Sequence, residues 1–160
     1  VTALHFDGAA QTRITPEVQA AVEQADLVVI APSNPLLSIE PMLALPDLRQ
    51  ALHASGARCI AVSPLIGGAA VKGPLVKMMS DLGLPVGNIG IARLYDGLID
   101  GLVIDYSDAV EQQALQSMGS IQVLTTSTLI PDTGRAAGLA RTLLDWHAQW
   151  VDGLNVECAT

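Results

Sequence analysis

The sequence predicts an α/β fold, a Rossmann-like three-layer sandwich with a mostly parallel sheet. Apolar runs typical of buried strands alternate with segments of helical periodicity along nearly the whole chain. The run 27–31 is short and continuously apolar, as expected for a strand buried on both faces of a parallel sheet. The sequence shows no internal repeat, low-complexity segment or linker, and its 160 residues suffice for one domain with a sizeable core.

Strands are predicted where apolar and β-branched residues cluster between turn residues. Six segments meet this description, with the fourth the weakest: 1–6, 27–31, 59–63, 89–95, 102–106 and 121–126. The first of them begins with Val1 rather than an initiator methionine. We therefore expect the chain to start inside a domain.

Helices are predicted between these strands, and their ends carry capping residues. Thr15 before Pro16 is a cap followed by proline at the first helical position. Gly56, Gly83 and Gly119 each end a helical segment, the first two of which start at prolines 46 and 74. A final helix is marked by an apolar stripe of four residues: Leu139, Leu143, Trp146 and Trp150.

Composition and charge exclude several functions. Eight Lys and Arg against sixteen Asp and Glu give a net charge of −8, which disfavours nucleic acid as a partner. No apolar run approaches the roughly 20 residues that a membrane helix needs. Cys59 and Cys158 have no metal or redox spacing, so Cys59 reads as a small core residue and a reduced, cytoplasmic setting is expected. His5, His53 and His147 are scattered and show no ligand spacing.

In a parallel α/β sheet, ligands bind beyond the carboxyl ends of the strands. The first loop in such a position follows Ala31. Asn34 precedes Pro35, which restrains its backbone to extended geometry and can fix the Ser33 hydroxyl and the Asn34 amide. Ser38 then stands at a predicted helix N-terminus, where free N–H groups favour an anion. The alternative is a stiff turn in which Ser38 is only the N-cap.

The second loop follows Ser63. Gly67 and Gly68 permit close approach to a ligand or positive φ, and Lys72 adds a cation. The spacing differs from that of a P-loop. A tight turn with a solvated lysine remains the alternative. Because the two loops follow two strands of one predicted sheet, they could flank the same crevice.

The third loop contains Asp105 at a strand end and Asp108 at a helix start. Two carboxylates in this position could hold Mg²⁺. In the alternative interpretation Asp108 and Glu111 form a capping box and Asp105 makes a structural turn.

Read together, these loops resemble the CofD family, the 2-phospho-L-lactate transferases of coenzyme F-420 biosynthesis. The resemblance rests on three stretches: ADLVVIAPSNPLLSIEPML (25–43), VSPLIGGAAVKGPLVKMM (62–79) and GLVIDYSD (101–108). It runs from about Phe6 to about Trp146, and it implies that residues 1–150 form the C-terminal part of a CofD-like transferase domain, followed by a tail at 151–160.

The resemblance implies an enzyme that moves a 2-phospholactyl or phosphoenolpyruvyl group from a guanosine diphosphate-linked donor. The acceptor is the ribityl hydroxyl of the deazaflavin Fo, GMP leaves, and Mg²⁺ is required. By family likeness, the first loop handles phosphate or the donor acid through Ser33, Asn34 and Ser38. The facing wall is formed by residues of the second loop, with Lys72 as the catalytic group: Gly67, Gly68, Lys72 and Gly73.

The chain departs from the family pattern in two respects. Glu40 stands where the family usually has glycine, and its carboxylate could repel phosphate, point away, bind metal or mark an altered donor preference. The glycine-rich loop and the acidic residues with which the family begins precede the region present here. We therefore expect these 160 residues alone to lack transferase activity, and to self-associate or pair with an N-terminal half.

A non-enzymatic alternative stays open. A related family of regulators shares the fold and binds nucleotide sugars without turnover. In that family the first loop typically reads Gly-Ser-Leu, so Ser33-Asn34-Pro35 favours the transferase.

Overall fold

The computed structural model describes residues 1–119 and 121–157, with side chains as far as residue 150. The chain divides into two compact units, the first from Val1 to Thr128 and the second from Leu129 onward. Each unit is described by itself.

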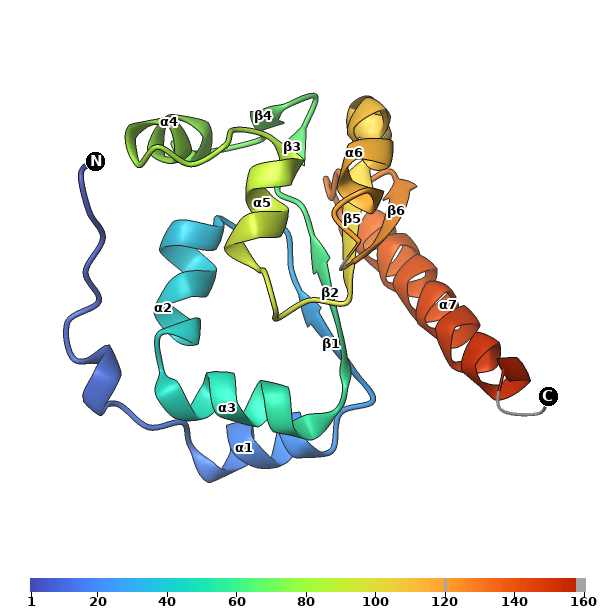
Figure 1. Ribbon diagram of the computed structural model, residues 1–160, viewed down its shortest axis with the longest axis horizontal. Helices are drawn as coiled ribbons and strands as arrows, with labels where there is room; N and C mark the ends of the chain where they lie inside the picture. The colour runs from blue at the N-terminus through green and yellow to red at the C-terminus, as the bar shows by residue number, and fades with distance from the viewer. Residues whose placement is uncertain (120, 158–160) are drawn as a thin grey trace. The chain divides into compact units, whose positions relative to one another are not determined.

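The first unit is built on a parallel sheet with the strand order β1-β2-β5-β6 (Figure 1). Its strands are β1 (Leu27–Ile30), β2 (Arg58–Val62), β5 (Gly101–Asp105) and β6 (Gln122–Thr126). All three pairings are parallel, so the carboxyl ends of the four strands lie at one edge. The prediction of an α/β fold with a mostly parallel sheet is confirmed.

The helices of this unit are short. They comprise α1 (Pro16–Glu23), α2 (Glu40–Leu43), α3 (Pro46–Ser55), α4 (Leu75–Asp81), α5 (Asn88–Leu94) and α6 (Gln112–Gln116). Turns of 3-10 helix occur at Ala9–Gln11 and Tyr106–Glu111, and Pro35–Ile39 forms one π-helical turn. A small antiparallel hairpin pairs β3 (Leu65–Ile66) with β4 (Ala69–Ala70).

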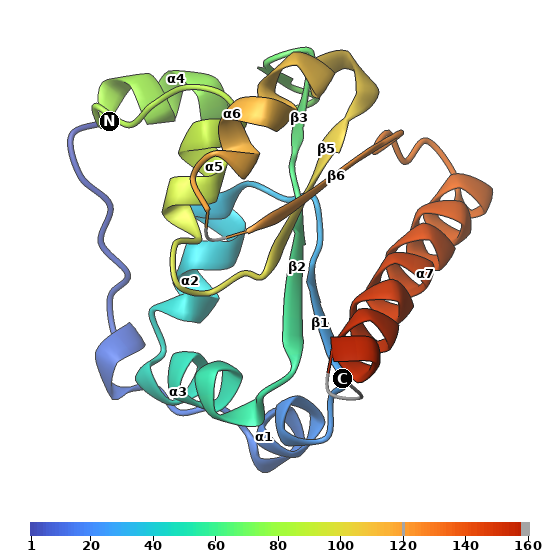
Figure 2. The ribbon, with the colours of Figure 1, turned by 45° about the vertical axis from the view of Figure 1, so that its right-hand side comes forward.

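The core of the first unit lies between the sheet and the helices α2, α4, α5 and α6, which are on one side of it (Figure 2). The sheet supplies alternate residues of its strands, since successive side chains point to opposite faces. The opposite face is apolar too, with Val29, Ile60, Val62, Val103 and Leu124 in register. Cys59 belongs to the core as predicted, and burial raises the pKa of its thiol to about 12.

Two helix ends agree in detail with the sequence analysis. The Thr15 hydroxyl oxygen accepts a hydrogen bond from the N–H of Val18 at 3.4 Å, with Pro16 as the first helical residue of α1. Gly56 follows α3 with φ of 69°, the left-handed geometry that a C-terminal glycine provides.

Two predicted strands are wrong. Residues 1–6 form no regular element, and 89–95 lie in helix α5 and its C-cap. A short run such as Ile-Gly-Ile fits either period, and packing decides. A Cβ on Gly90 would lie 1.8 Å from the Pro85 carbonyl oxygen, so α5 approaches the preceding loop as only glycine allows. Ile91 and Tyr95, one turn apart, then point into the core.

The second unit contains one long helix, α7 (Thr133–Glu157). Asp132 accepts a hydrogen bond from the N–H of Arg135 at 2.8 Å, which starts the helix six residues before the predicted stripe. Trp146 and Trp150 make an edge-to-face contact with their ring centroids 4.6 Å apart. The helix continues through 151–157, which the sequence analysis assigned to a tail, and 158–160 lie outside the described residues.

Among the helices that the structure describes, none has the length and apolar character that crossing a membrane requires.

Candidate functional site

The three loops singled out from the sequence all begin at the carboxyl edge of the sheet. They follow β1, β2 and β5, which are neighbours in the order β1-β2-β5-β6. Parallel pairing therefore brings residues 31–40, 63–74 and 105–111 to the same edge. This is the edge at which α/β folds bind ligands.

The first loop is organised by Asn34. Its backbone is extended, with φ −61° and ψ 113°, as the following proline requires. Its side-chain oxygen accepts hydrogen bonds from the N–H groups of Leu36 at 2.9 Å and Leu37 at 3.1 Å. Asn34 is therefore the N-cap of the turn Pro35–Ile39, and the alternative in which Ser38 is the cap is wrong.

Ser38 lies inside the π-helical turn. The backbone N–H groups of Ser38 and Ile39 both donate to the Asn34 carbonyl oxygen, and that of Glu40 reaches back to Pro35, which widens the turn. Such turns occur frequently at functional sites. The Ser38 side chain is exposed, and its hydroxyl forms no hydrogen bond within residues 1–119 and 121–157. Its hydroxyl is thus available to a ligand.

Glu40 opens helix α2 and is partly buried. Burial first, and the Glu40 carboxylate second, raise the pKa of the Tyr95 phenol at the end of α5. The sequence-based interpretations of Glu40 all remain predictions.

The second loop forms the β3–β4 hairpin. Gly67 and Gly68 make its turn with φ of 61° and 72°, the pair of left-handed residues that a tight two-residue hairpin needs. The N–H of Gly67 donates to Asp108 Oδ2 at 3.0 Å and that of Gly68 donates to Asp108 Oδ1 at 2.6 Å. These two N–H groups, which belong to the predicted facing wall of the site, already donate to a carboxylate.

The same two bonds correct the capping-box interpretation of Asp108. Its carboxylate caps no helix, because it reaches across to the hairpin and is only 3% exposed. Asp105 is the cap instead and accepts from the N–H of Ser107 at 2.9 Å. Glu111, the other member of the proposed box, bonds to Asn88.

A buried polar network lies under the hairpin, and the sequence analysis missed it. The Ser63 hydroxyl donates to Asn88 Oδ1 at 2.5 Å and accepts from the N–H of Leu65 at 3.1 Å. Glu111 accepts from the backbone N–H of Asn88 at 2.9 Å. Ser63 and Asn88 are 1% and 0% exposed, so the base of the hairpin is fixed within the protein interior.

Lys72 lies on the exposed segment 71–74 between β4 and α4. Within the described part of the chain its ammonium group forms no ion pair and no hydrogen bond. Gly73 follows it with φ of 84°. The structure therefore presents Lys72 as an exposed cation just beyond a firmly held hairpin.

Asp105 is held in the third loop by hydrogen bonds from the chain. Its Oδ2 accepts from the N–H of Thr128 at 2.9 Å and from the Thr128 hydroxyl at 3.3 Å. Burial alone raises the pKa of Asp105, but hydrogen bonds from Ser107 and Thr128 outweigh burial and hold the pKa below its usual value. The structural-turn interpretation of Asp105 is confirmed.

Asp105 and Asp108 are both held by hydrogen bonds to the chain, and nothing in their contacts points to a magnesium ion. All four of their carboxylate oxygens accept hydrogen bonds from protein groups. A magnesium ion needs oxygen ligands in near-octahedral array. Among the residues that the structure describes, no three His, Cys, Asp or Glu side chains gather as a metal group.

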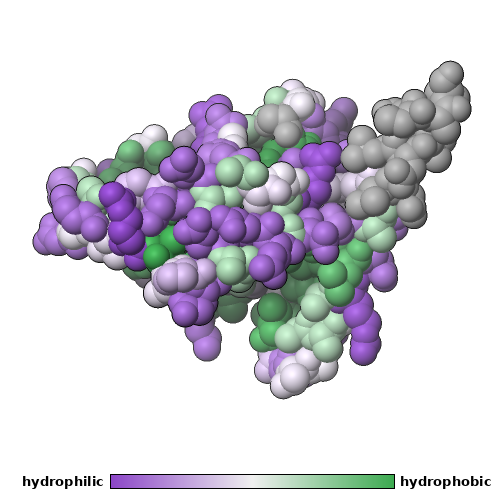
Figure 3. Space-filling view, turned by 90° about the horizontal axis from the view of Figure 1, so that it is seen from below, coloured by the Kyte–Doolittle hydropathy of each residue, from purple (hydrophilic) through white to green (hydrophobic). Residues whose placement is uncertain are grey.

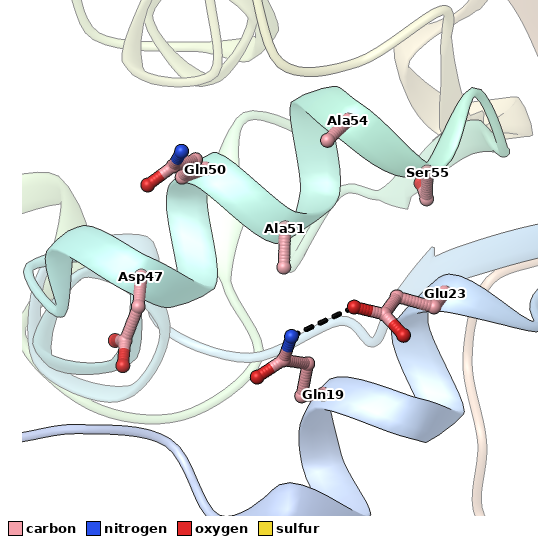
Figure 4. A pocket seen from close by; sticks show the side chains of 7 residues that line it. All are labelled: Gln19, Glu23, Asp47, Gln50, Ala51, Ala54 and Ser55. Atoms are coloured by element: carbon pink, nitrogen blue, oxygen red, sulfur yellow. Dashed lines mark hydrogen bonds between the residues drawn. The ribbon is translucent and has the colours of Figure 1, made fainter.

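A groove of about 440 Å³ lies between α1 and α3, away from these loops. Its lining is mixed, with two alanines among polar side chains, and the side-chain amide of Gln19 donates to Glu23 at 2.7 Å (Figure 4). Figure 3 shows a largely hydrophilic surface on this side of the protein. Because α1 and α3 lead into the amino ends of β1 and β2, the groove is at the other end of the sheet, and no predicted site residue lines it.

Comparison with known proteins identifies related sequences. The profile of the family described as 2-phospho-L-lactate transferase CofD matches residues 2–132. The chain is 35% identical over 140 residues to a 2-phospho-L-lactate transferase of Methanosarcina barkeri, which covers 88% of this chain and 44% of the relative. It is 33% identical over 139 residues to a phosphoenolpyruvate transferase of Streptomyces griseus, with 86% and 43% covered. The chain thus spans less than half the length of these curated relatives.

Among solved structures, a member of the UPF0052 family from Bacillus halodurans superposes with a TM-score of 0.46 and 17% identity. The superposition covers 74% of this chain and 41% of that one.

Proposed function

The chain belongs to the CofD family of 2-phospho-L-lactate transferases, and on that premise we propose which reaction the whole protein catalyses. The proposed enzyme transfers a 2-phospholactyl or phosphoenolpyruvyl group from a guanosine diphosphate-linked donor to the ribityl hydroxyl of the deazaflavin Fo. GMP is released, and the product is an intermediate of coenzyme F-420 biosynthesis. The observation that carries the proposal is about one-third identity, over most of the chain, to relatives named as these transferases.

The arrangement of the loops supports the proposal. An alcohol attacks one phosphorus of a diphosphate bridge, a new P–O bond forms, and the bond to the GMP oxygen breaks as the hydroxyl proton leaves. Such a reaction depends on alignment and on neutralising negative charge more than on covalent catalysis. Two loops with hydroxyl, amide and ammonium groups follow adjacent parallel strands at the ligand-binding edge.

Each side chain has a distinct role in this proposal. Lys72, exposed and without a partner in the described chain, binds the diphosphate and stabilises charge that develops on the departing GMP. Ser33 and Ser38 offer hydroxyls to the donor, and the Asn34 side chain offers its NH₂ group while its oxygen caps the turn. Gly67 and Gly68 shape the facing wall rather than donate to phosphate, because Asp108 takes their N–H groups.

Magnesium remains part of the proposal only by family likeness. Asp105 and Asp108 are engaged in hydrogen bonds to the chain, so we derive no step through the ion. The choice between lactate and enolpyruvate is also open, because the relatives carry both names.

The test uses the full-length protein with Fo, Mg²⁺ and each of the two guanosine diphosphate-linked donors. We expect GMP release that requires Fo, faster with one donor than with the other. Binding of a nucleotide sugar without GMP release from either donor would instead support the regulatory alternative.

A further inference from the structure

Asp108 holds the tip of the β3–β4 hairpin through both of its carboxylate oxygens. Two consecutive N–H groups in left-handed conformation form a concave anion site, and here the anion is this carboxylate. The contact joins residues 40 and 41 positions apart in the sequence. Charge-assisted bonds to a buried carboxylate are stronger than ordinary ones, so the tip is firmly held.

The base of the hairpin is held separately. The N–H of Leu65 donates to the Ser63 hydroxyl, and Ser63 is bonded to the fully buried Asn88. The side chain of Leu65 is itself 0% exposed. With base and tip both fixed, the point where the chain leaves β4 at Ala70 is fixed as well, two residues before Lys72.

The occupied anion site also limits what the hairpin can bind. A phosphate cannot take the N–H groups of Gly67 and Gly68 while the Asp108 carboxylate accepts both. An anion at this wall therefore meets the exposed Lys72 rather than the hairpin tip.

We propose that Asp108 is a positioning residue of the transferase site, whose carboxylate sets the place of the Gly67–Gly68 turn and through it the reach of Lys72. It touches neither donor nor acceptor. The contribution to turnover rests on the proposed function. The two hydrogen bonds from the Gly67 and Gly68 N–H groups to Asp108, called the clamp below, do not rest on the proposed function and can be measured without substrates.

The first experiment measures amide hydrogen exchange in the full-length protein. Asp108→Asn replaces one acceptor oxygen by an NH₂ group, which cannot accept from an N–H. We expect exchange at Gly67 and Gly68 to become about tenfold faster or more, as for amides whose local hydrogen bonds open more readily. Asp100→Asn is the matched control, since Asp100 also accepts through both carboxylate oxygens, from Arg58 and from the N–H of Cys59, but from no group in the hairpin. It should leave exchange at Gly67 and Gly68 unchanged.

The second experiment is a double-mutant cycle on turnover. Misplacing a charged catalytic group by up to about an ångström can lower the reaction rate about 100-fold. We therefore expect Asp108→Asn to lower kcat about 10- to 100-fold. If Asp108 acts through Lys72, the same change in a Lys72→Met background should lower kcat less than about twofold further. A residue needed only for folding gives equal losses in both backgrounds.

The following results decide the proposal. Unchanged exchange at Gly67 and Gly68 in folded Asp108→Asn overturns the clamp, and additive losses in the cycle overturn the action through Lys72. If Asp108→Asn fails to fold, Asp108→Glu keeps both acceptor oxygens on a longer side chain. If the amides of Gly67 and Gly68 in Asp108→Glu stay protected while kcat falls, the result supports a positioning role for Asp108. If kcat of Asp108→Glu equals that of the wild type, the positioning role is overturned. Absence of transfer by the wild-type protein contradicts the proposed function, and amide exchange then decides the clamp alone.

Discussion

The two loops at the carboxyl edge of the sheet are held in opposite ways. The turn after β1 is organised by its own residue Asn34, which bonds to N–H groups two and three positions along the chain. The hairpin after β2 is held by residues 25 to 41 positions away, through Asn88 and Asp108. The hydrogen bonds that hold the first loop lie within seven consecutive residues, whereas those that hold the hairpin come from two later parts of the chain.

The difference has consequences for the site. A locally capped turn keeps its shape even when distant packing changes, because its hydrogen bonds close within it. The hairpin and the following Lys72 depend on the correct arrangement of α5 and the segment after β5. We therefore expect changes in the residues that hold the hairpin to affect both stability and turnover, and changes in the first loop to affect each less.

The largest effect is expected for Lys72→Met in the full-length protein. Losing one electrostatic contact to developing charge should lower transfer at least about 100-fold, which is roughly 3 kcal/mol in the barrier. Stability should change by less than about 0.5 kcal/mol, as for most exposed surface positions. Steady-state GMP release and chemical unfolding of the same protein measure the two effects.

Lys77→Met is the matched control for this change. Lys77 is an exposed lysine five positions further on, in α4, where it pairs with Asp81 at 2.6 Å. Its loss should leave transfer unchanged. Equal losses of transfer in the two variants would show that net charge, and not the position of Lys72, is responsible.

The second prediction tests the long-range support. Asn88→Ala removes the acceptor of the buried Ser63 hydroxyl and leaves a gap where the side chain is 0% exposed. An unsatisfied buried group and the lost packing should cost roughly 2 kcal/mol of unfolding free energy. Urea unfolding measures this, and amide exchange at Leu65 should accelerate in parallel. A stability within 0.5 kcal/mol of wild type, on the order of a surface change, would mean that the hairpin base is held by other contacts.

The same difference explains how much the sequence could predict. Asn34 before Pro35 gave the geometry of the first loop correctly, because proline restricts its neighbour whatever the rest of the chain does. The alternative in which Ser38 is the N-cap is wrong, since a π-helical turn has no recognisable spacing in a single sequence. For Gly67 and Gly68 the sequence leaves close approach to a ligand and positive φ both open, and their partner Asp108 could not be predicted because only the folded chain brings them together.

At the level of the fold, strong local signals predicted the elements and weak ones did not. The four strands of the sheet and the ends of α1 and α3 follow from apolar runs and capping residues. Helix α5 was predicted as a strand because its short apolar run fits both periods, and the close packing of Gly90 on Pro85 that favours the helix is a tertiary contact.

The third prediction compares the two asparagines that support the two loops, Asn34 in the first loop and Asn88 under the hairpin. Asn34→Ala removes a cap, and it should cost about 1 kcal/mol, less than Asn88→Ala. Asn34→Asp keeps the acceptor oxygen and should restore the stability, yet it places a negative charge where we expect donor phosphate. Urea unfolding should therefore show that Asn34→Ala is less stable than Asn34→Asp. Titration with the donor should show weaker binding by Asn34→Asp. If Asn34→Ala destabilises as much as Asn88→Ala, the first loop is not locally supported.

The smallest effect is expected for Ser38→Ala, which asks whether the first loop binds the donor at all. Because Asn34 is the cap and the Ser38 hydroxyl has no partner in the described chain, removing it should change stability by less than about 0.5 kcal/mol. If the hydroxyl donates to phosphate, the Kd for the guanosine diphosphate-linked donor should rise about five- to tenfold, near the 1 kcal/mol of one hydrogen bond. Ser80→Ala, at an exposed serine of α4, is the control and should alter neither quantity. Titration calorimetry and urea unfolding on both variants distinguish the outcomes. An unchanged Kd for Ser38→Ala would leave Lys72 and the hairpin as the donor contacts of this chain and reduce the first loop to a supporting turn.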